Sequence, residues 1–400
     1  MHVARGDGVG LLRELLRVDS RNPTLVPGGP GEHAVAHTLR DILASWGLRA
    51  HLREAAPGRP NVIARIGNGA NGAPTLMFNG HIDVVGIDGM THDPWASMEQ
   101  DGKLYGRGAS DMKAGVAAMC AAAARLADRS IAGELIVAAV VDEEFESLGT
   151  RALIEGGLRA DAAIVTEPTQ LAIMPAHRGF VWIDVTTLGR AAHGSRWDLG
   201  VDAIRHAGLV LAELERLDSE HLPRASHPLL GRPSIHASLI EGGSGMSTYP
   251  ERCTLRLERR TIPGETPDAV RREIEDVCAA VAARQPQFRA EVTVTLSQPP
   301  SDVAVDAPIV RAVEEAIRGS GGGDSDVRIA GGNGAGGWRC AENDSAATGR
   351  SASTPCRRRS LFPPFEYRAA VLPYWRRRKV PRLSQEIRTS RLPHFPRNKP

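Results

Sequence analysis

The chain lacks three features that would place it in a membrane or in an oxidising compartment. Among its 400 residues there is no run of 18 or more apolar residues, so we expect no membrane-spanning helix. The first residues do not show the charged and then apolar pattern of a secretory leader. The five cysteines are scattered and form no C-x-x-C pair, which is typical of reduced thiols. We therefore expect a cytoplasmic protein with no membrane partner.

A strong net charge is also absent from the chain as a whole, but two parts of the chain differ in sign. The formal net charge is +2. Residues 331–400 hold 15 basic and 4 acidic residues, a net charge of +11, which leaves −9 for residues 1–330. A basic end can bind nucleic acid or an acidic partner. We do not favour nucleic acid, because another origin of this segment, given below, explains the change in charge better.

Strand-like and helix-like patterns alternate over residues 1–180. Helices are predicted over residues 8–18, 31–46 and 112–127, the last of which is rich in alanine. Apolar strand patterns such as TLMFNGHIDVV and ELIVAAVVDEE lie among them. This alternation predicts an α/β domain with a mostly parallel sheet, in which functional residues collect at the carboxyl ends of the strands.

A different pattern begins near residue 180. Residues 181–296 show the order β-α-β-β-α-β of the ferredoxin-like plan, which predicts an inserted domain with one antiparallel sheet and two helices. The helical pattern DAPIVRAVEEAIRG then returns to the first domain. We therefore predict a catalytic domain from residues 1–180 plus 297–330. Residues 331–400 are basic and rich in proline, with no helical or strand period.

Acidic and imidazole side chains follow several predicted strands or open a predicted helix. They are His81 with Asp83, Asp111, Glu143 with Glu144, and Glu167. Taken singly, Asp111 could cap the helix that follows it, and Glu143 with Glu144 could form a solvated loop. Taken together at one edge of a sheet, one imidazole and several carboxylates are too anionic to remain without cations. We predict two divalent, zinc-like ions at this edge.

Such a pair of ions would support hydrolysis. Two ions about 3.5–4 Å apart can share a carboxylate and lower the pKa of a water between them. A carboxylate beside that water can take its proton and pass it to a leaving amine, and Glu143 and Glu144 can divide the roles of base and ligand. Asp83 is placed to orient the ring of His81. A metal-dependent nuclease or phosphatase would use similar ligands.

Six segments, in order, resemble the M20 metallopeptidases. They read GHIDVV, GRGASDMKAG, DEEFESLGT, TEPT, AAHGS and ERRTIPGE. That family includes acetylornithine deacetylase, succinyl-diaminopimelate desuccinylase, aminoacylase and carboxypeptidase G2-like enzymes. The resemblance covers roughly residues 8–320. It implies a zinc-exopeptidase-like catalytic domain with a ferredoxin-like lid, and hydrolysis of N-acyl amino acids or small peptides with zinc, cobalt or manganese.

The resemblance also implies a role for each matched residue of the cluster. His81 and Glu167 would bind the first ion, and Asp111 would bridge both ions. Glu144 would bind the second ion, and Glu143 would be the general base that acts on the metal-activated water. The peptide bond after Asp111 would be cis.

Two residues of the inserted domain match the family as well. His193 would reach across a homodimer, formed through the lid, into the site of the partner and stabilise the oxyanion. Arg260 would hold the carboxylate of the substrate, for which a guanidinium fork is suited. Both the inserted domain and Arg260 favour a small carboxylate-bearing amide over a nucleic acid or a phosphate ester.

The segment from residue 331 onward departs from the family pattern. The resemblance implies a last histidine ligand in a glycine-rich GAH loop, and the only histidine here is His394, in LPHFP. We hypothesise that residues 331–400 come from a shifted reading frame, which translation of the gene in its other two frames tests. The alternatives are a divergent tail that binds an acidic partner, or a ligand role for His394 or Cys340. Without a replacement ligand the chain would be a catalytically impaired or dead member of the family.

Overall fold

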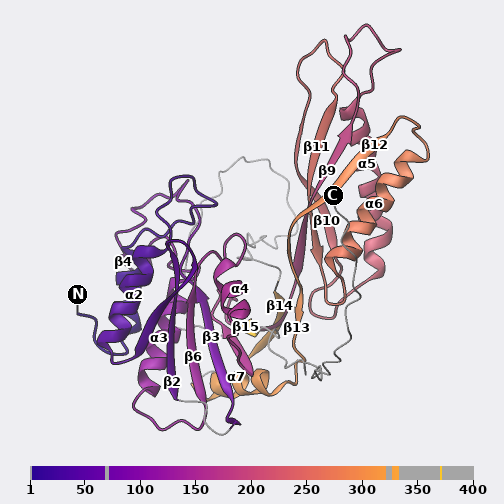
Figure 1. Cartoon of the computed structure of the whole chain (residues 1–400). Coiled ribbons are helices and arrows are strands. Elements are labelled where there is room, and N and C mark those ends of the chain that lie inside the picture. Colours follow the sequence, from indigo (N-terminus) through magenta and orange to yellow (C-terminus); the bar gives the residue numbers. More distant parts are fainter. Residues whose placement is uncertain (1, 68–71, 321–326, 333–369, 372–400) are drawn as a thin grey trace, which may run out of the picture.

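Two sheets organise the protein, as a computed structural model shows (Figure 1). The structure describes residues 2–67, 72–320, 327–332 and 370–371. A nine-stranded sheet forms the larger body, at the lower left of Figure 1, and a four-stranded sheet forms an elongated body above it. A separate ribbon pairs β4 (Met98–Gln100) with β5 (Lys103–Tyr105). No helix in the described ranges is long and apolar enough to cross a membrane.

The large sheet is mixed, with parallel pairs at its centre and antiparallel pairs toward both of its edges. Its order is β1-β2-β6-β3-β7-β15-β8-β13, and β14 also pairs with β8. The strands are β1 (Arg49–Ala56), β2 (Arg59–Gly67), β3 (Thr75–His81), β6 (Glu134–Val140), β7 (Ala162–Val165), β8 (Ala172–His177), β13 (Ser301–Asp302), β14 (Arg328–Gly332) and β15 (Ala370–Val371). Strands β6, β3 and β7 pair in parallel. Strands β1 and β2 pair antiparallel because a tight turn joins them, in which Gly58 has φ +74°.

Helices cover both faces of the large sheet. They are α1 (Gly8–Leu16), α2 (His33–Ser45), α3 (Lys113–Leu126), α4 (Leu148–Glu155) and α7 (Pro308–Gly319). On β6, Leu135 and Val137 join the apolar cluster beneath α1, α2 and α3. Their neighbours Ile136 and Ala138 join a second cluster that includes Leu153 of α4. Burial on both faces explains why β6 reads as one continuous apolar run, and it confirms the predicted α/β class.

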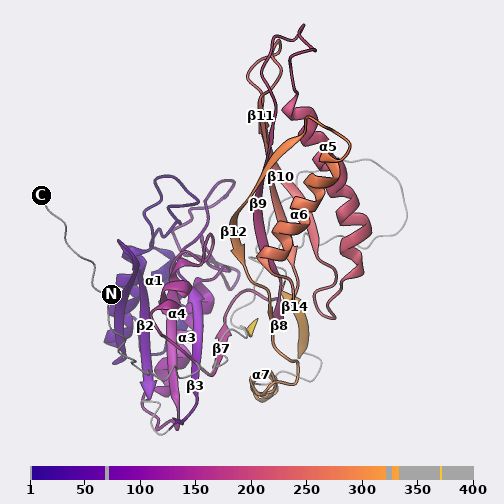
Figure 2. The ribbon, with the colours of Figure 1, turned by 45° about the vertical axis from the view of Figure 1, so that its right-hand side comes forward.

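The elongated body contains the predicted β-α-β-β-α-β order. Its elements are β9 (Gly179–Leu188), α5 (Ala203–Arg216), β10 (Ser234–Gly242), β11 (Arg252–Thr261), α6 (Pro267–Ala282) and β12 (Arg289–Gln298). A π-helical segment (Leu217–His221) and a 3-10 helix (Leu222–Arg224) follow α5. The strand order is β10-β11-β9-β12, and every pair is antiparallel. Helices α5 and α6 lie on one face of this sheet (Figure 2), where Val181, Ile183 and Val185 are buried.

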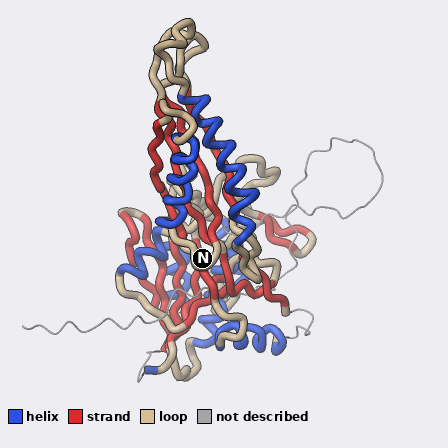
Figure 3. Tube along the Cα trace, turned by 90° about the vertical axis from the view of Figure 1, so that its right-hand side faces the viewer, coloured by secondary structure: helices blue, strands red, loops and turns tan. Residues whose placement is uncertain are grey.

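The four strands of this body run from a junction with the larger body to a distant tip. Strand β9 begins at Gly179, directly after β8, and its other end, Leu188, lies toward the tip. Figure 3 shows the loops of the tip at the top of the molecule. At the junction, the Gln298 side-chain amide donates a hydrogen bond of 3.1 Å to the carbonyl oxygen of Glu146, which ties β12 to the loop before α4.

Candidate metal centre

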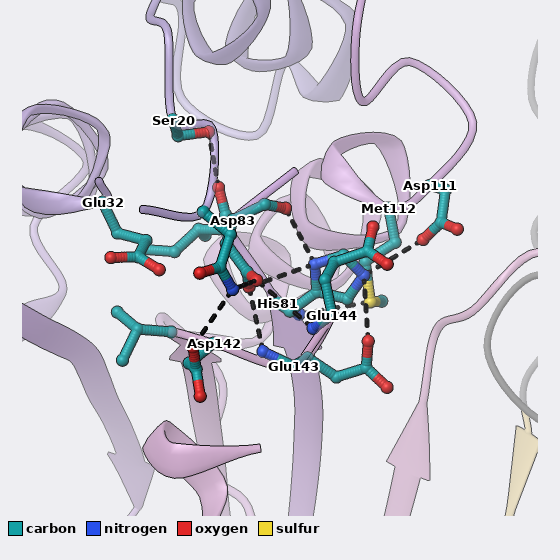
Figure 4. A network of polar contacts seen from close by, with 12 residues as sticks. Ser20, Glu32, His81, Asp83, Asp111, Met112, Asp142, Glu143 and Glu144 are labelled. Carbon is teal, nitrogen blue, oxygen red and sulfur yellow. Dashed lines mark hydrogen bonds and ion pairs between the residues drawn. The ribbon is translucent and has the colours of Figure 1, made fainter. Parts of the chain in front are cut away.

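Five of the predicted side chains meet at one edge of the large sheet. His81 is the last residue of β3, Glu143 and Glu144 follow β6, and Glu167 follows β7. Because these three strands are neighbours and run parallel, their carboxyl ends lie together. Asp111 reaches the same place from the turn before α3 (Figure 4). We call these five residues the carboxylate cluster.

The imidazole of His81 lies within the carboxylate cluster. Its Nε2 atom is 3.0 Å from Asp111 Oδ1, 3.6 Å from Glu167 Oε1 and 3.7 Å from Glu143 Oε2. Two sets of three residues have all their ligand atoms within 4.8 Å of one another. These sets are His81 with Asp111 and Glu144, and His81 with Glu143 and Glu167. The side chain of His81 is fully buried, whereas those of Asp111, Glu143 and Glu167 are 25%, 33% and 26% exposed, so solvent reaches the carboxylates.

The carboxylates of the cluster lie so close together that they raise one another's pKa values. Burial, together with neighbouring carboxylates, raises the pKa of Glu143 to about 7 and that of Glu144 to about 8. The same causes raise the pKa of Glu167 well above its usual value. Burial alone would lower the pKa of His81, but the carboxylates of Glu167 and Asp111 outweigh it and raise that pKa. Among the residues that the structure describes, no lysine or arginine forms an ion pair with these four carboxylates.

This donor set fits divalent ions. Carboxylate oxygens and an imidazole nitrogen are ligands of zinc and its neighbours, and such ions displace the protons that crowded acids hold. The Nδ1 atom of His81 is 2.9 Å from the carbonyl oxygen of Asp83 and 3.4 Å from its Oδ1. Asp83 therefore orients the imidazole, as the sequence predicted, but its closer contact is through the backbone carbonyl.

Asp83 also holds the turn after β6. Its side chain is fully buried, and its two carboxylate oxygens accept the backbone N–H groups of Glu143 at 3.1 Å and of Glu144 at 3.2 Å. Figure 4 shows Asp83 between His81 and this turn. Glu143 and Glu144 thus lie in a loop that solvent reaches, as one interpretation of the sequence held, but a buried acid fixes their backbone.

Asp111 is not a helix cap. The residue at the N-cap of α3 is Met112, which makes no side-chain cap hydrogen bond, and Asp111 Oδ1 faces His81 instead. The interpretation of Asp111 as a cap is therefore wrong. The peptide bond between Asp111 and Met112 is cis, as the resemblance implied.

His193 and Arg260 lie outside the carboxylate cluster. His193 lies in the loop that follows β9, where it forms a bridge with Thr248. Arg260 lies near the junction end of β11, with its guanidinium 5.6 Å from the ring centroid of Phe180. The Arg260 guanidinium forms an ion pair with Glu258.

Sequence reasoning missed a group of buried polar residues behind the cluster. Asn22, Glu32 and Asp142 are 0%, 0% and 2% exposed, and Arg59 contacts all three. These residues come from four separate segments with no common spacing. Asp142 opens the matched segment DEEFESLGT, but nothing in the sequence links it to the other three residues. The expected last histidine ligand, and the alternatives His394 and Cys340, lie outside the described residues.

The chain is similar in sequence to known peptidases and deacylases. Residues 77–339 match the model of Peptidase family M20/M25/M40. The chain is 33% identical to an acetylornithine deacetylase of Myxococcus xanthus over 270 residues, which are 66% of this chain and 70% of that protein. It is 28% identical to a probable succinyl-diaminopimelate desuccinylase of Staphylococcus epidermidis over 286 residues, 64% of this chain and 68% of that protein.

Solved structures show the same fold at lower identity. A tripeptidase from Staphylococcus aureus superimposes with a TM-score of 0.65 at 22% identity, covering 83% of this chain and 86% of that one. A dinuclear metal binding peptidase of the M20 family from Bacillus subtilis gives a TM-score of 0.59 at 17% identity, covering 82% and 83%. By the family match and the identity to its relatives, this chain belongs to peptidase family M20/M25/M40, a family of metal-dependent amide hydrolases.

Proposed function

We propose that this chain uses two divalent ions to hydrolyse the amide bond of N-acyl amino acids or small peptides. The observation that carries the proposal is the carboxylate cluster, which gathers one imidazole and four carboxylates without a paired cationic side chain among the described residues. Bound ions would polarise the amide carbonyl and acidify an attacking water. Relatives named as deacetylase and desuccinylase make N-acetyl and N-succinyl amino acids the first substrates to test.

Each residue of the cluster receives a role. We assign His81 and Glu167 to the first ion, Asp111 to a bridge between the ions, and Glu144 to the second ion. Glu143 is the general base, which would take a proton from water and give it to the leaving amine. A pKa of about 7 for Glu143, raised by burial, supports this role because a base of that pKa can accept and return a proton near neutral pH.

We further propose zinc as the natural ion and Arg260 as the substrate-binding residue. Zinc suits a mixed imidazole and carboxylate set, while cobalt and manganese are the next candidates for so many oxygen ligands. The side chain of Arg260 is 27% exposed near the junction of the two bodies. Because its guanidinium already pairs with Glu258, a substrate carboxylate would replace or share that contact.

A homodimer through the four-stranded body would complete the site. Strand β10 is at the edge of its sheet, and its Leu239 and Ile240 are 57% and 58% exposed. Nearby on α5, Ile204 is 42% exposed. An apolar edge strand with unpaired backbone groups can pair with a second copy of itself about a two-fold axis. In such a dimer, the partner would supply the imidazole of His193 that one chain leaves at its own tip.

The state of the cysteines supports the cytoplasm as the proposed location. Cys120, Cys253 and Cys278 are buried and free in the structure. Burial raises the pKa of Cys120 to about 12, so its thiol stays protonated and unreactive at neutral pH.

The first test measures metal content per chain. Protein dialysed against a small excess of zinc should retain close to two ions per chain and should hydrolyse members of a panel of N-acyl amino acids and dipeptides. One ion or fewer per chain, with no hydrolysis of the panel, would contradict the proposal. That result would identify the chain as an impaired member of its family.

Variants then separate base from ligand. Glu143→Gln should lower kcat by about 100- to 10,000-fold, the usual contribution of a general base, and should keep close to two ions per chain. Glu144→Gln should instead lose one ion. Glu155→Gln, on the exposed surface of α4, is the matched control and should change neither quantity. Loss of an ion in Glu143→Gln would mean that the two roles are reversed.

A further inference from the structure

We infer that Arg59 is a positioning residue for the turn that carries Glu143 and Glu144, and that it acts through Asp142 and Asn22. The inference rests on the proposed function, because it concerns how the proposed base and ligand are held. Arg59 is the first residue of β2 and lies behind the carboxylate cluster, with a side chain that is 14% exposed. It therefore acts without contact to an ion or a substrate.

Arg59 is the cation that contacts two of the three buried acids behind the cluster. Glu32 and Asp83 are 0% exposed and Asp142 is 2% exposed. The Nε of Arg59 donates to Glu32 Oε2 at 2.9 Å, and Nη2 donates to the other oxygen of Glu32. On its other side, Nη1 lies 2.9 Å from Asp142 Oδ1. One rigid guanidinium thus bridges two carboxylates, and its loss would leave both buried without a countercharge.

Asn22 extends this bridge to Asp83. Its Nδ2 donates to Asp83 Oδ2 at 2.8 Å and to Asp142 Oδ1 at 3.1 Å, while its Oδ1 accepts from Arg59 Nη2 at 3.3 Å. The Asn22 side chain is fully buried, so every polar group of the amide is used inside the protein. Figure 4 shows Glu32, Asp83 and Asp142 arranged around this part of the network.

The two acids at the end of this network hold the backbone of the catalytic turn. Asp83 accepts the N–H groups of Glu143 and Glu144, and Asp142 Oδ2 accepts the N–H of Glu146 at 3.3 Å. Asp142 itself has φ +62°, a left-handed conformation that residues other than glycine rarely adopt. Such a conformation persists only where surrounding contacts enforce it. Arg59 supplies the contact that fixes the Asp142 side chain from the far side.

The test compares Arg59→Met with the matched control Arg65→Met. Arg65 lies on the same strand but pairs with Glu134, 2.7 Å away, on the neighbouring strand β6. Hydrogen exchange of the zinc-free full chain, read by mass spectrometry, should be about 10-fold faster or more for the peptide covering residues 141–149 in Arg59→Met only. Zinc affinity should fall about 10- to 100-fold, as for other residues that orient ligands, and kcat should fall with little change in KM.

Two further variants keep the inference falsifiable. Glu32→Gln/Arg59→Met removes opposite charges together, so it retains the charge balance if Arg59→Met alone fails to fold. It should still show fast exchange over residues 141–149, because Asp142 still lacks the guanidinium of Arg59. Arg59→Lys keeps the charge without the fork and should recover only part of the zinc affinity.

The outcomes separate this inference from the proposed function. Wild-type exchange over residues 141–149 in the double variant would overturn the inference. The two ideas can also separate. If Arg59→Met exchanges fast over residues 141–149 but the wild-type chain binds no zinc, the inference is supported and the proposed function is contradicted.

Discussion

Lys113 is a fully buried cation in the first turn of α3. Its Nζ donates to the carbonyl oxygens of Leu15 and Val18, each at 2.9 Å, and lies 5.7 Å from the ring centroid of Trp95. Burial lowers the pKa of Lys113 to about 7, although the carboxylate of Asp19 opposes the shift. The ammonium group of Lys113 therefore loses its proton near pH 7 in the folded protein, whereas a lysine in the unfolded chain loses its proton near pH 10.5.

This shift predicts how stability depends on pH. Between pH 7 and pH 10.5 the unfolded chain binds a proton that the folded chain does not, so Lys113 makes the free energy of unfolding rise with pH. The slope for one proton is at most about 1.4 kcal/mol per pH unit. Urea unfolding at pH 7 and pH 9, with a chelator present, should show wild type gaining stability relative to Lys113→Met. A difference between the two proteins that does not vary with pH would contradict the prediction.

At the scale of elements, the start of α3 packs against the loop that follows β7. A Cβ atom on Gly115 would lie 2.1 Å from the carbonyl oxygen and 2.8 Å from the Oγ1 of Thr166. Thr166 directly precedes Glu167 of the carboxylate cluster. The glycine therefore lets the helix approach the loop closely enough to place Glu167 beside His81.

Gly115→Ala should accordingly affect both stability and metal binding. Overpacking of this kind costs about 1–3 kcal/mol, and displacement of Thr166 should weaken zinc binding. Gly208→Ala in α5 is the matched control, because a Cβ atom there would have no heavy atom within 4 Å, and alanine should stabilise the helix by up to about 1 kcal/mol. Urea unfolding and zinc titration measure the two effects. Equal zinc affinity in both variants would show that this contact does not place Glu167.

Local sequence patterns predicted elements well where one face is apolar. The helices α1, α2 and α3 begin and end within two residues of their predicted limits. Apolar residues recur at helical spacing in α1 and α2, whereas α3 is rich in alanine, a strong helix former. Strand β8 was not predicted, since Pro175 interrupts its pattern. The cluster residues that follow β3, β6 and β7 could be predicted because the apolar pattern of each strand shows where the strand ends. The Arg59 network could not be predicted, because its contacts join residues as far apart as the 120 positions between Asn22 and Asp142.

At the scale of the whole molecule, the two proposed parts of the site lie on different bodies, with the carboxylate cluster on the large sheet and His193 on the elongated body. Strand β9 starts at Gly179 beside the larger body, and the loop that carries His193 follows its far end, Leu188 (Figure 1). Ten residues of strand separate them, about 33 Å at the usual rise. We therefore propose a second copy of the chain as the source of the His193 imidazole.

Mixing two inactive variants tests this arrangement. His193→Ala should lack the imidazole that each chain gives to its partner, and Glu143→Gln should lack the base that each chain keeps. In a mixed dimer, the cluster of the His193→Ala chain retains Glu143 and receives the intact His193 of the other chain. After subunit exchange at equal amounts, half the dimers should be mixed with one working site each, so activity should return to about a quarter of wild type.

Measurement of hydrolysis against mixing time distinguishes the alternatives, because activity should appear at the rate of subunit exchange. Glu143→Gln mixed with the double variant Glu143→Gln/His193→Ala is the control, since no pairing of these chains restores a base. Activity that never exceeds the sum of the two separate variants, in a mixture shown to exchange, would mean that His193 does not act across subunits. Full activity of His193→Ala alone would instead show that this imidazole has no part in the reaction, and that the tip loop serves the dimer only.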